Sequence, residues 1–375
     1  MNFRINKNKF YNALSVANRA VSSNSPIPAL SGIRIDAAEG KLILTASDVN
    51  TSIKAELCSD QDDSLGLNII QEGSIVIDAK YLMDIVKKID SEDISVSIID
   101  GTLTHFAGQK AEFKINGYRP EDYPVIDFSE PSVNIDFKYS VLSSLISETA
   151  FAASVKETRP VLMGVNLKSD GSTLTCTATD SYRLARKTVS VESEQFSVTV
   201  PARTLFDARS IFQDSEDVRV ALNQKKIQFI GNGIVLQSNL LEGGYPETDR
   251  LIPKEFSRRL VINRLSLIQA IDRTSFIKTD NMTIIRLQIN SSDDISLSNK
   301  SQEIGESHES LNAVSYEGEP IDISFSGTYV SDAVKALSSE NVTVSFTGEM
   351  KPFIIQNDAE DKTLLQLVLP VRTYN

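Results

Sequence analysis

The side chains best suited to acid–base, redox or metal chemistry are few and scattered. The two histidines, His105 and His308, have no partner at a metal-ligand spacing, so both are predicted to be solvated surface residues. The two cysteines, Cys58 and Cys176, lie far apart in strand-like segments, which predicts small buried side chains rather than a disulfide or a metal pair. The sequence contains no GxGxxG, GxxxxGK[ST], HExxH or GxSxG motif. The remaining candidates for function are binding surfaces made of charged and apolar side chains.

Charge is unevenly distributed along the chain. The net charge of −12 disfavours binding to nucleic acid, because neutralising phosphates requires lysine and arginine. The segments predicted to be helices nevertheless carry a net positive charge when they are taken together, so the rest of the chain must be more negative than −12. These predicted helices are 8–21, 79–89, 138–152, 201–213, 263–278 and 327–338. Helices gathered on one side would form a basic wall that tracks a polyanion. The alternative, that these helices are simply basic surface elements, stays open on charge alone.

Apolar stripes at helical spacing recur three times. One helix of each repeat begins after Asp78, Pro201 or Ser326 and carries an aspartate six residues later. Its apolar stripes are Leu82, Ile85, Val86 and Ile89; Leu205, Ala208 and Phe212; and Val330, Ala333, Val334 and Leu337. The recurring aspartates are Asp84, Asp207 and Asp332.

A second helix opens each repeat, and strands recur after it. The opening stripes are Phe10, Leu14, Ala17 and Val21; Val141, Leu145 and Ala152; and, least regularly, Leu265, Ile268 and Ile271. Residues 42–48 resemble residues 174–180, and the third copy, at 285–289 and 295–297, has diverged. Glycine-containing pairs such as Glu39-Gly40 predict hairpin turns. The chain is therefore predicted to be α+β, with two helices on antiparallel sheets in each of three domains, 1–127, 128–254 and 255–375.

Bulk composition fits a globular protein without a membrane span. Hydrophobic residues make up 41% of the 375 residues, enough for a sizeable core. No apolar run reaches the ~18 residues that a transmembrane helix needs. The N-terminus lacks the apolar stretch of a signal peptide, so a cytoplasmic protein without a cofactor or metal is expected. Polar, proline-bearing linkers are expected at 127–134 and 253–259.

Three short segments carry a resemblance to a known family. Residues 177–184, with the sequence TATDSYRL, the GGYP element at 243–246 and the LPVR at 369–372 are similar to the bacterial DNA sliding clamps, the β subunits of DNA polymerase III. The resemblance covers the whole chain and is strongest to Gram-positive members. It implies a head-to-tail homodimeric ring with twelve inner helices and an outer layer of sheets. It also implies a non-catalytic processivity factor that encircles duplex DNA and holds the replicative polymerase near its template.

The resemblance also implies three sets of functional residues. A pocket for a short hydrophobic peptide of the polymerase, the clamp loader or other partners would consist of Leu162, Thr179, Tyr182, Arg183, Leu184, Pro246, Arg250, Leu251, Met350, Pro352, Leu369, Pro370, Val371 and Arg372. The residues facing DNA would be Lys80, Lys156 and Arg203, although Asn24 and Thr328 stand where the family often has a base. The dimer interface would join Phe113 and Ile115 to Phe276 and Ile277 of the partner.

Two other classes of protein compete with this interpretation. An extracellular, β-rich adhesin would be expected to have a signal peptide and disulfides or calcium loops. A hydrolase using acidic residues would be expected to have a cleft with shifted carboxylate pKa values. The acidic clusters at 60–63 and 293–294 lie in predicted turns, where solvated charge is the ordinary situation.

Overall fold

The computed structural model describes residues 1–375 except 23–24, 61, 279–282, 359–362 and 373–375. The chain folds into two compact units, Met1–Leu142 with Asp207–Leu240 and Ser143–Phe206 with Leu241–Asn375. We name the three predicted domains repeat 1 (1–127), repeat 2 (128–254) and repeat 3 (255–375), and each helix or strand is assigned to the repeat that contains it.

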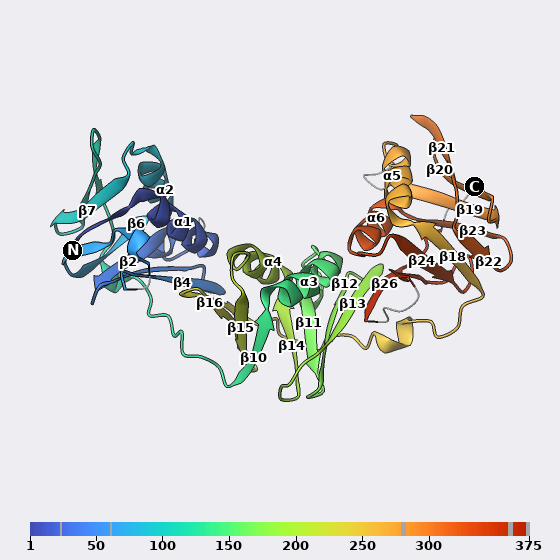
Figure 1. Ribbon diagram of the computed structural model, residues 1–375, viewed down its shortest axis with the longest axis horizontal. Helices are drawn as coiled ribbons and strands as arrows, with labels where there is room; N and C mark the ends of the chain where they lie inside the picture. Colours follow the sequence, from blue (N-terminus) through green and yellow to red (C-terminus); the bar gives the residue numbers. More distant parts are fainter. Residues whose placement is uncertain (23–24, 61, 279–282, 359–362, 373–375) are drawn as a thin grey trace. The chain divides into compact units, whose positions relative to one another are not determined.

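Each repeat has two α-helices of similar length. The first helices are α1 (Lys7–Ala17), α3 (Tyr139–Thr149) and α5 (Arg264–Thr274), and the second are α2 (Ala79–Lys88), α4 (Ala202–Ile211) and α6 (Gly327–Lys335). Helices α1 and α2 contact each other, as do α5 and α6 (Figure 1). The predicted start signals are confirmed for α2 and α6, because the side chains of Asp78 and Ser326 accept backbone N–H bonds there, and α4 begins directly after Pro201.

Antiparallel strands make up the rest of each repeat. Repeat 1 contains β1 (Asn2–Asn6), β2 (Gly32–Ala38), β3 (Lys41–Ser47), β4 (Thr51–Cys58), β5 (Asn68–Gln71), β6 (Gly73–Asp78), β7 (Asp93–Asp100), β8 (Leu103–Ala107) and β9 (Glu112–Asn116). Repeat 2 contains β10 (Val133–Lys138), β11 (Gly164–Ser169), β12 (Thr173–Thr179), β13 (Arg183–Ser190), β14 (Phe196–Pro201), β15 (Asp217–Leu222), β16 (Lys226–Gly231) and β17 (Ile234–Asn239). Repeat 3 contains β18 (Arg258–Asn263), β19 (Ile284–Ser291), β20 (Asp294–Ser301), β21 (Gly305–Leu311), β22 (Ser315–Glu317), β23 (Ile321–Ser326), β24 (Asn341–Phe346), β25 (Phe353–Asn357) and β26 (Leu364–Val368).

Two of the sheets run from one repeat into the next. In one compact unit, β17 of repeat 2 pairs with β4 of repeat 1, giving the order β10-β15-β16-β17-β4-β3-β2-β6. In the other, β13 of repeat 2 pairs with β26 of repeat 3, giving β14-β11-β12-β13-β26-β25-β24-β18-β22. The two remaining sheets, β5-β1-β7-β8-β9 and β21-β20-β19-β23, each belong to one repeat. Repeat 2 is therefore divided between the two units, since its two sheets continue into different neighbours.

The helices turn their apolar stripes to the sheets, with two exceptions to the prediction. Phe10, Leu14 and Ala17 are buried as expected in α1. In α5, however, Leu265 is exposed and the buried face is Leu267, Ala270, Ile271 and Thr274. In α3, Val141 is exposed while Leu142, Leu145 and Ile146 are buried. The predicted register was therefore wrong there, because apolar side chains also lie on the solvent faces of these helices.

The smaller expectations from sequence have mixed outcomes. Cys176 is buried in β12, and burial raises the pKa of its thiol to about 12; Cys58 is half-buried, and both are free cysteines. His308 is exposed, whereas His105 is half-buried and its Nε2 lies 3.0 Å from a carboxylate oxygen of Glu112, so the prediction of a solvated side chain was wrong for His105.

The predicted linkers are shorter than expected, since β10 begins at Val133 and β18 at Arg258. Within the described part of the chain, no helix is long and apolar enough to span a membrane.

Candidate functional site

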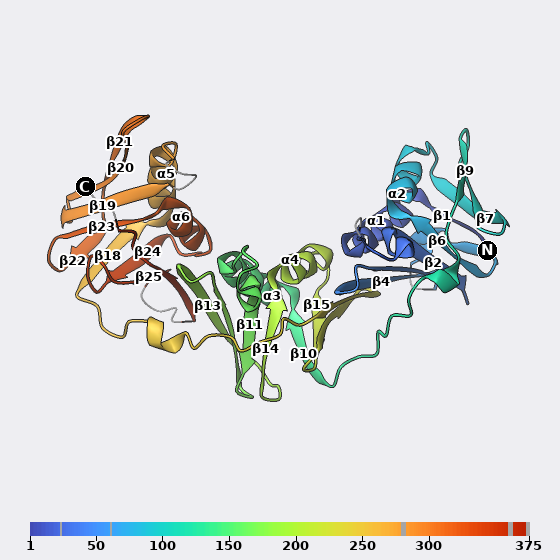
Figure 2. The ribbon, with the colours of Figure 1, turned by 180° about the vertical axis from the view of Figure 1, so that it is seen from behind.

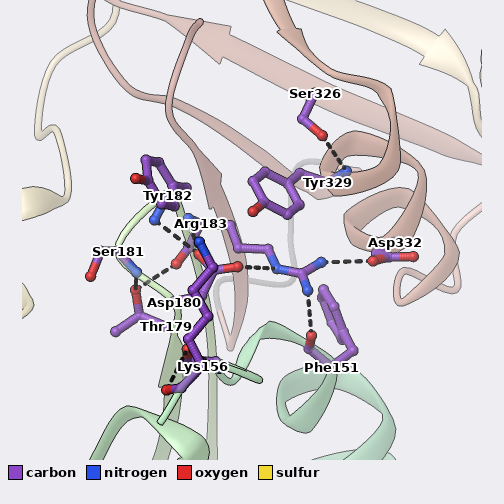
Figure 3. Close-up of polar contacts among 11 residues, drawn as sticks. Phe151, Lys156, Thr179, Asp180, Ser181, Tyr182, Arg183, Ser326, Tyr329 and Asp332 are labelled. Carbon is purple, nitrogen blue, oxygen red and sulfur yellow. Dashed lines mark hydrogen bonds and ion pairs between the residues drawn. The ribbon is translucent and has the colours of Figure 1, made fainter. Parts of the chain in front are cut away.

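Arg183 is the centre of a polar cluster that joins repeats 2 and 3 (Figure 3). Its Nε donates to Asp180 Oδ2 at 3.0 Å, its Nη1 to Asp332 Oδ2 at 2.7 Å, and its Nη2 to the carbonyl oxygen of Phe151 at 2.7 Å. The guanidinium also lies over two rings, with its carbon 5.4 Å from the centroid of Phe151 and 4.6 Å from that of Tyr329. All three guanidinium nitrogens thus have acceptors, and the side chain is only 13% exposed.

A tight turn before β13 sets the position of this arginine. Asp180 Oδ1 accepts the backbone N–H groups of Tyr182 and Arg183, at 2.9 and 3.0 Å, and Ser181 between them has a φ of 80°. One aspartate therefore holds both the backbone of the turn and the guanidinium of Arg183. The sequence pointed to Arg183 as a residue at the pocket rim. In the structure, its nitrogens bind the protein itself.

An apolar cluster lies beside this turn. Leu184 of β13, Ile354 of β25 and Leu367 of β26 are buried together, and the half-buried Ile252, Leu365 and Leu369 pack against them. Of the predicted pocket residues, Leu184 and Leu369 belong to this cluster, while Leu162 and Thr179 are also buried. Leu162, Thr179 and Leu184 therefore have little surface of their own to offer a ligand.

Three large side chains of the predicted pocket are exposed, and each lies within a few residues of a cluster member along the chain. Tyr182 is 58% exposed beside Leu184, Leu251 is 52% exposed beside Ile252, and Met350 is 53% exposed close to Ile354. Arg250 and Arg372 are exposed, and the half-buried positions are Pro246, Pro352, Pro370 and Val371. Exposed apolar side chains close to a buried apolar cluster are typical of a site that binds a hydrophobic peptide.

The C-terminal segment is anchored to the same region. The backbone N–H of Leu369 donates to the carbonyl oxygen of Tyr182 at 2.9 Å, and that of Val371 donates to Ser324 at 2.7 Å. A segment so close to the chain end would fray without such partners. The predicted pocket residues at 369–371 therefore have a fixed backbone.

A polar cavity of about 290 Å³ lies between one face of strands β11, β12 and β13 and the segment 245–249. Arg186 lines it and binds Thr248 Oγ1 at 2.6 Å and Asp249 at 2.7 Å, which attaches the 245–249 segment to β13. Pro246 is the predicted pocket residue among its lining residues. This cavity is lined mainly by hydroxyl, amide and charged groups, so it does not serve as the apolar pocket that the sequence predicts.

The predicted DNA-facing residues lie at helix starts and in one loop. Lys80 and Arg203 are exposed at the second positions of α2 and α4, and Thr328 is exposed at the same position of α6. Lys156 is exposed in the loop that follows α3. Asn24 lies outside the described residues.

The predicted interface residues divide into exposed and buried ones. Phe113 and Ile115 are half-buried on β9, which forms one edge of its sheet (Figure 2). Phe276 is 65% exposed, but Ile277 is only 1% exposed. Ile277 therefore has no side-chain surface to give to a partner, and the expectation for this residue needs correction. The reason is its position, since it follows its helix at the same distance as the buried Ala20 and Ala152 follow theirs.

The sequence reasoning missed Phe151, Asp180 and Tyr329 as members of the Arg183 cluster. Burial raises the pKa of the Tyr329 phenol, in keeping with its place between the repeats. One sequence signal for this cluster was the aspartate that recurs at position six of the second helices. In α6 this aspartate is Asp332, which accepts a hydrogen bond from the guanidinium of Arg183. In the described part of the chain, no group of three or more histidine, cysteine, aspartate or glutamate side chains could hold a metal ion.

The architecture of three repeats, each with two helices on antiparallel sheets, is that of the DNA clamps, and comparisons with known proteins support this. Family profiles match the N-terminal domain of the DNA polymerase III beta subunit at residues 1–127, its central domain at 136–247 and its C-terminal domain at 249–372. The beta sliding clamp of Bacillus subtilis (strain 168) is 36% identical over 379 residues, covering 100% of both chains.

Solved structures give the same result. The crystal structure of the DNA polymerase sliding clamp from Bacillus subtilis matches with a TM-score of 0.94, at 36% identity and with 100% of both chains covered. A sliding clamp from Bartonella birtlesii, bound to griselimycin, matches with a TM-score of 0.92 at 26% identity, again over 100% of both chains. The chain belongs to the family of bacterial β sliding clamps, the β subunits of DNA polymerase III. It is a non-catalytic processivity factor of DNA replication, and neither the adhesin nor the hydrolase alternative has support.

Proposed function

We propose that two copies of this chain close head to tail into a ring around duplex DNA. The observation that carries the proposal is the strand pairing between repeats. The fourth strand of repeat 1, β4, pairs with the last strand of repeat 2, β17, and the fourth strand of repeat 2, β13, pairs in the same way with the last strand of repeat 3, β26. Repeat 3 is left with its fourth strand, β21, at a sheet edge, and repeat 1 with its last strand, β9. The same rule would pair β21 of one copy with β9 of another.

Closure of the ring would remove two open sheet edges. An unpaired edge invites uncontrolled association, so a specific partner there is favourable. Phe113 and Ile115 on β9 and the exposed Phe276 after α5 supply apolar contacts for the junction. Because a heterologous contact that closes gives a ring and not a fibre, two copies with three repeats each would complete six repeats.

DNA would be held by linkage and by weak contacts with the helices. Lys80, Arg203 and Lys156 are the proposed contacts with phosphates. Their exposure on helix starts and a loop supports long, water-mediated interactions, which do not fix the protein at one sequence. The acidic remainder of the chain would disfavour DNA on the outside.

The apolar cluster at β13 and β26 is the proposed docking site for partner peptides. The buried Leu184 of this cluster and the exposed Tyr182, Leu251 and Met350 support a short hydrophobic ligand, and the buried Leu162 and Thr179 are proposed as further pocket residues. The rim and tail positions proposed are Tyr182, Arg183, Pro246, Arg250, Leu251, Met350, Pro352, Leu369, Pro370, Val371 and Arg372. The partners would be the replicative polymerase, the clamp loader and other DNA-processing proteins. A related clamp bound to griselimycin supports the presence of a ligand site in this family.

The domain bounds and the location of the protein are part of the same proposal. Domains 1–127, 128–254 and 255–375 agree closely with the three segments matched by the family profiles, and a cytoplasmic location follows from the replicative role.

Sedimentation tests the proposed dimer directly. We expect a species near twice the 41.3 kDa subunit mass at micromolar concentration. Phe276→Asp should shift the equilibrium to monomer, because it places a charge in an apolar junction. Val155→Asp, at an exposed apolar residue of repeat 2, which supplies no strand to the proposed junction, is the control and should leave the dimer intact. A stable monomer of the unaltered chain would contradict the ring.

A further inference from the structure

The fourth strands of the three repeats can be aligned through the strands that pair with them. In each repeat, the residue before the second helix pairs with a residue of the second strand. The residue two positions further along the second strand pairs with the third strand, which in turn pairs with the fourth. This route leads from Asp78 to Lys54, from Pro201 to Arg186 and from Ser326 to His308. His308 of β21 is therefore equivalent to Lys54 of β4 and Arg186 of β13.

The last strands can be aligned in the same way from the first helices. The residue four positions before each first helix begins a series of three cross-strand pairs that ends in the last strand of the repeat. The series lead from Phe3 to Phe113, from Ile135 to Leu236 and from Leu260 to Gln366. Phe113 of β9 is therefore equivalent to Leu236 of β17 and Gln366 of β26.

Both junctions inside the chain join these equivalent positions in one register. Leu236 pairs with Ile53 and Gln366 pairs with Ala185, in each case the residue just before the aligned position of the fourth strand. In β21 the residue in that place is Ser307, directly before His308. The two internal junctions therefore specify a register for the proposed junction between β9 and β21.

The same register between two copies of the chain would place Phe113 opposite Ser307 of the partner subunit. The pairs on either side are Glu112 with His308 of the partner subunit and Lys114 with Glu306 of the partner subunit. Directly opposite residues of an antiparallel pair have their Cβ atoms about 5 Å apart, so these side chains can contact each other. Both pairs unite a carboxylate with a group that can carry a positive charge.

Glu112 already binds one histidine within the single chain. Nε2 of His105 on β8 lies 3.0 Å from Oε2 of Glu112, and the side chain of Glu112 is 69% exposed. A carboxylate accepts hydrogen bonds through both of its oxygens, and this contact uses Oε2. A second donor can therefore bind Oε1 without displacing His105.

We propose that Glu112 at each junction lies between two histidines, His105 of its own chain and His308 of the partner subunit, and that protonation of these histidines strengthens the dimer. The inference rests on the proposed homodimer and its register. The chain has two histidines in 375 residues, and the register brings both to one carboxylate. The site is incomplete in a single subunit, because His308 gains this carboxylate from a second copy.

The sign of the pH dependence follows from this arrangement. Histidine is the side chain that ordinarily changes its charge between pH 5 and 8. The dimer places a carboxylate beside His308 and therefore favours its protonated form, so the dimer binds more protons than two separate subunits. Association is accordingly strongest at the acidic end of this range and weakens as the pH rises through it.

The other groups beside the two histidines keep their charges over the same range. Lysine and acidic side chains ordinarily titrate outside it. Glu309, next to His308 along the chain, accepts from Arg273 Nε at 3.1 Å, and this bond lowers the pKa of Glu309. The remaining neighbours are Ser97 and Asp100 on β7, Lys110 in the turn before β9, Lys114 on β9, Ser298 and Lys300 on β20, and Glu306 on β21.

The dimer dissociation constant at about pH 6 and about pH 8 tests the inference. Fluorescence-detected sedimentation of the full chain, with EDTA present, measures the constant at both values. We expect tighter association at the lower pH by about threefold for each junction, since exposed ion pairs are weak, and by about tenfold for a ring with two junctions. His308→Asn and Glu112→Gln should each lose most of this ratio.

Lys114→Gln is the matched control on the same strand. It removes a charge that the register places opposite Glu306 of the partner subunit, so it should weaken the dimer at both pH values and keep the tenfold ratio. The general loss of negative charge on acidification acts on every variant alike. The ratio that remains in His308→Asn therefore gives the background.

The outcomes separate this inference from the ring proposal. If the unaltered chain is a monomer, both are wrong. If it is a dimer and His308→Asn or Glu112→Gln keeps the full ratio, the histidine pair is wrong while the dimer stands. If a single variant is a monomer at both pH values, the exchange variant Glu112→His/His308→Glu decides. A dimer that is again tighter at the lower pH supports the inference, and any other behaviour of the exchange variant overturns it.

Discussion

At the scale of single residues, the candidate peptide site separates into residues that fold the protein and residues that are available to a ligand. Leu184 and Leu162 are buried, and Arg183 has all three guanidinium nitrogens committed to acceptors in the protein. Tyr182, Leu251 and Met350 are each more than half exposed. Affinity for a partner peptide should therefore depend on the exposed three, while changes at the buried positions would act mainly through stability.

Alanine substitution of the exposed residues tests this separation. We expect Tyr182→Ala, Leu251→Ala and Met350→Ala each to weaken binding of a polymerase-derived hydrophobic peptide by about tenfold, or about 1.4 kcal/mol, without a change in stability. Isothermal titration calorimetry measures the affinity. Ile304→Ala, which removes an equally exposed side chain from the turn between β20 and β21, is the control. Unchanged affinity in all three variants would show that the peptide binds elsewhere.

At the scale of elements, the junction between repeats 1 and 2 depends on a glycine in a hairpin. Asn232 and Gly233 both have positive φ, 48° and 72°, in the turn between β16 and β17. The carbonyl oxygen of Gly233 accepts the backbone N–H of Glu56 at 2.8 Å, and a Cβ at Gly233 would lie 2.9 Å from the carbonyl oxygen of Glu56. The turn therefore requires glycine both for its conformation and for the approach of β4.

Two glycine variants distinguish these effects. Gly101→Ala introduces only the strain of a positive φ, because nothing lies within 4 Å of the added Cβ, and should cost about 1 kcal/mol. Gly233→Ala adds a backbone clash at the junction and should cost about 1–3 kcal/mol more. Urea unfolding followed by circular dichroism measures both. Equal losses would mean that the junction tolerates a shift of β4.

The sequence predicted the elements better than their contacts. Helical periodicity located all three second helices, since apolar stripes and start signals agreed at Asp78, Pro201 and Ser326. It failed in register at Leu265 and Val141, because apolar residues on exposed faces imitate the buried stripe. The recurring aspartate singled out Asp332, but its contact with Arg183 could not be predicted, because the members of the Arg183 cluster are separated by up to 181 positions, from Phe151 to Asp332, and only the fold brings them together.

At the scale of the whole molecule, one rule of strand pairing joins neighbouring repeats. Inside the chain, the fourth strand of one repeat pairs with the last strand of the next, as β4 does with β17 and β13 does with β26. In repeat 1 the last strand, β9, and in repeat 3 the fourth strand, β21, lie at sheet edges. Head-to-tail pairing of two copies would apply the same rule to these two edge strands, which is why they are assigned to one interface.

Retention on DNA is the most direct test of the central claim, that the protein holds duplex DNA by enclosing it. The protein is loaded onto a nicked circular plasmid by a clamp loader, purified on the circle, and then exposed to a restriction enzyme that cuts once. We expect the protein to stay on the uncut circle at a salt concentration that suppresses phosphate contacts and to leave within minutes after cutting, because only topology holds it. Equal retention on circular and linear DNA would contradict the account.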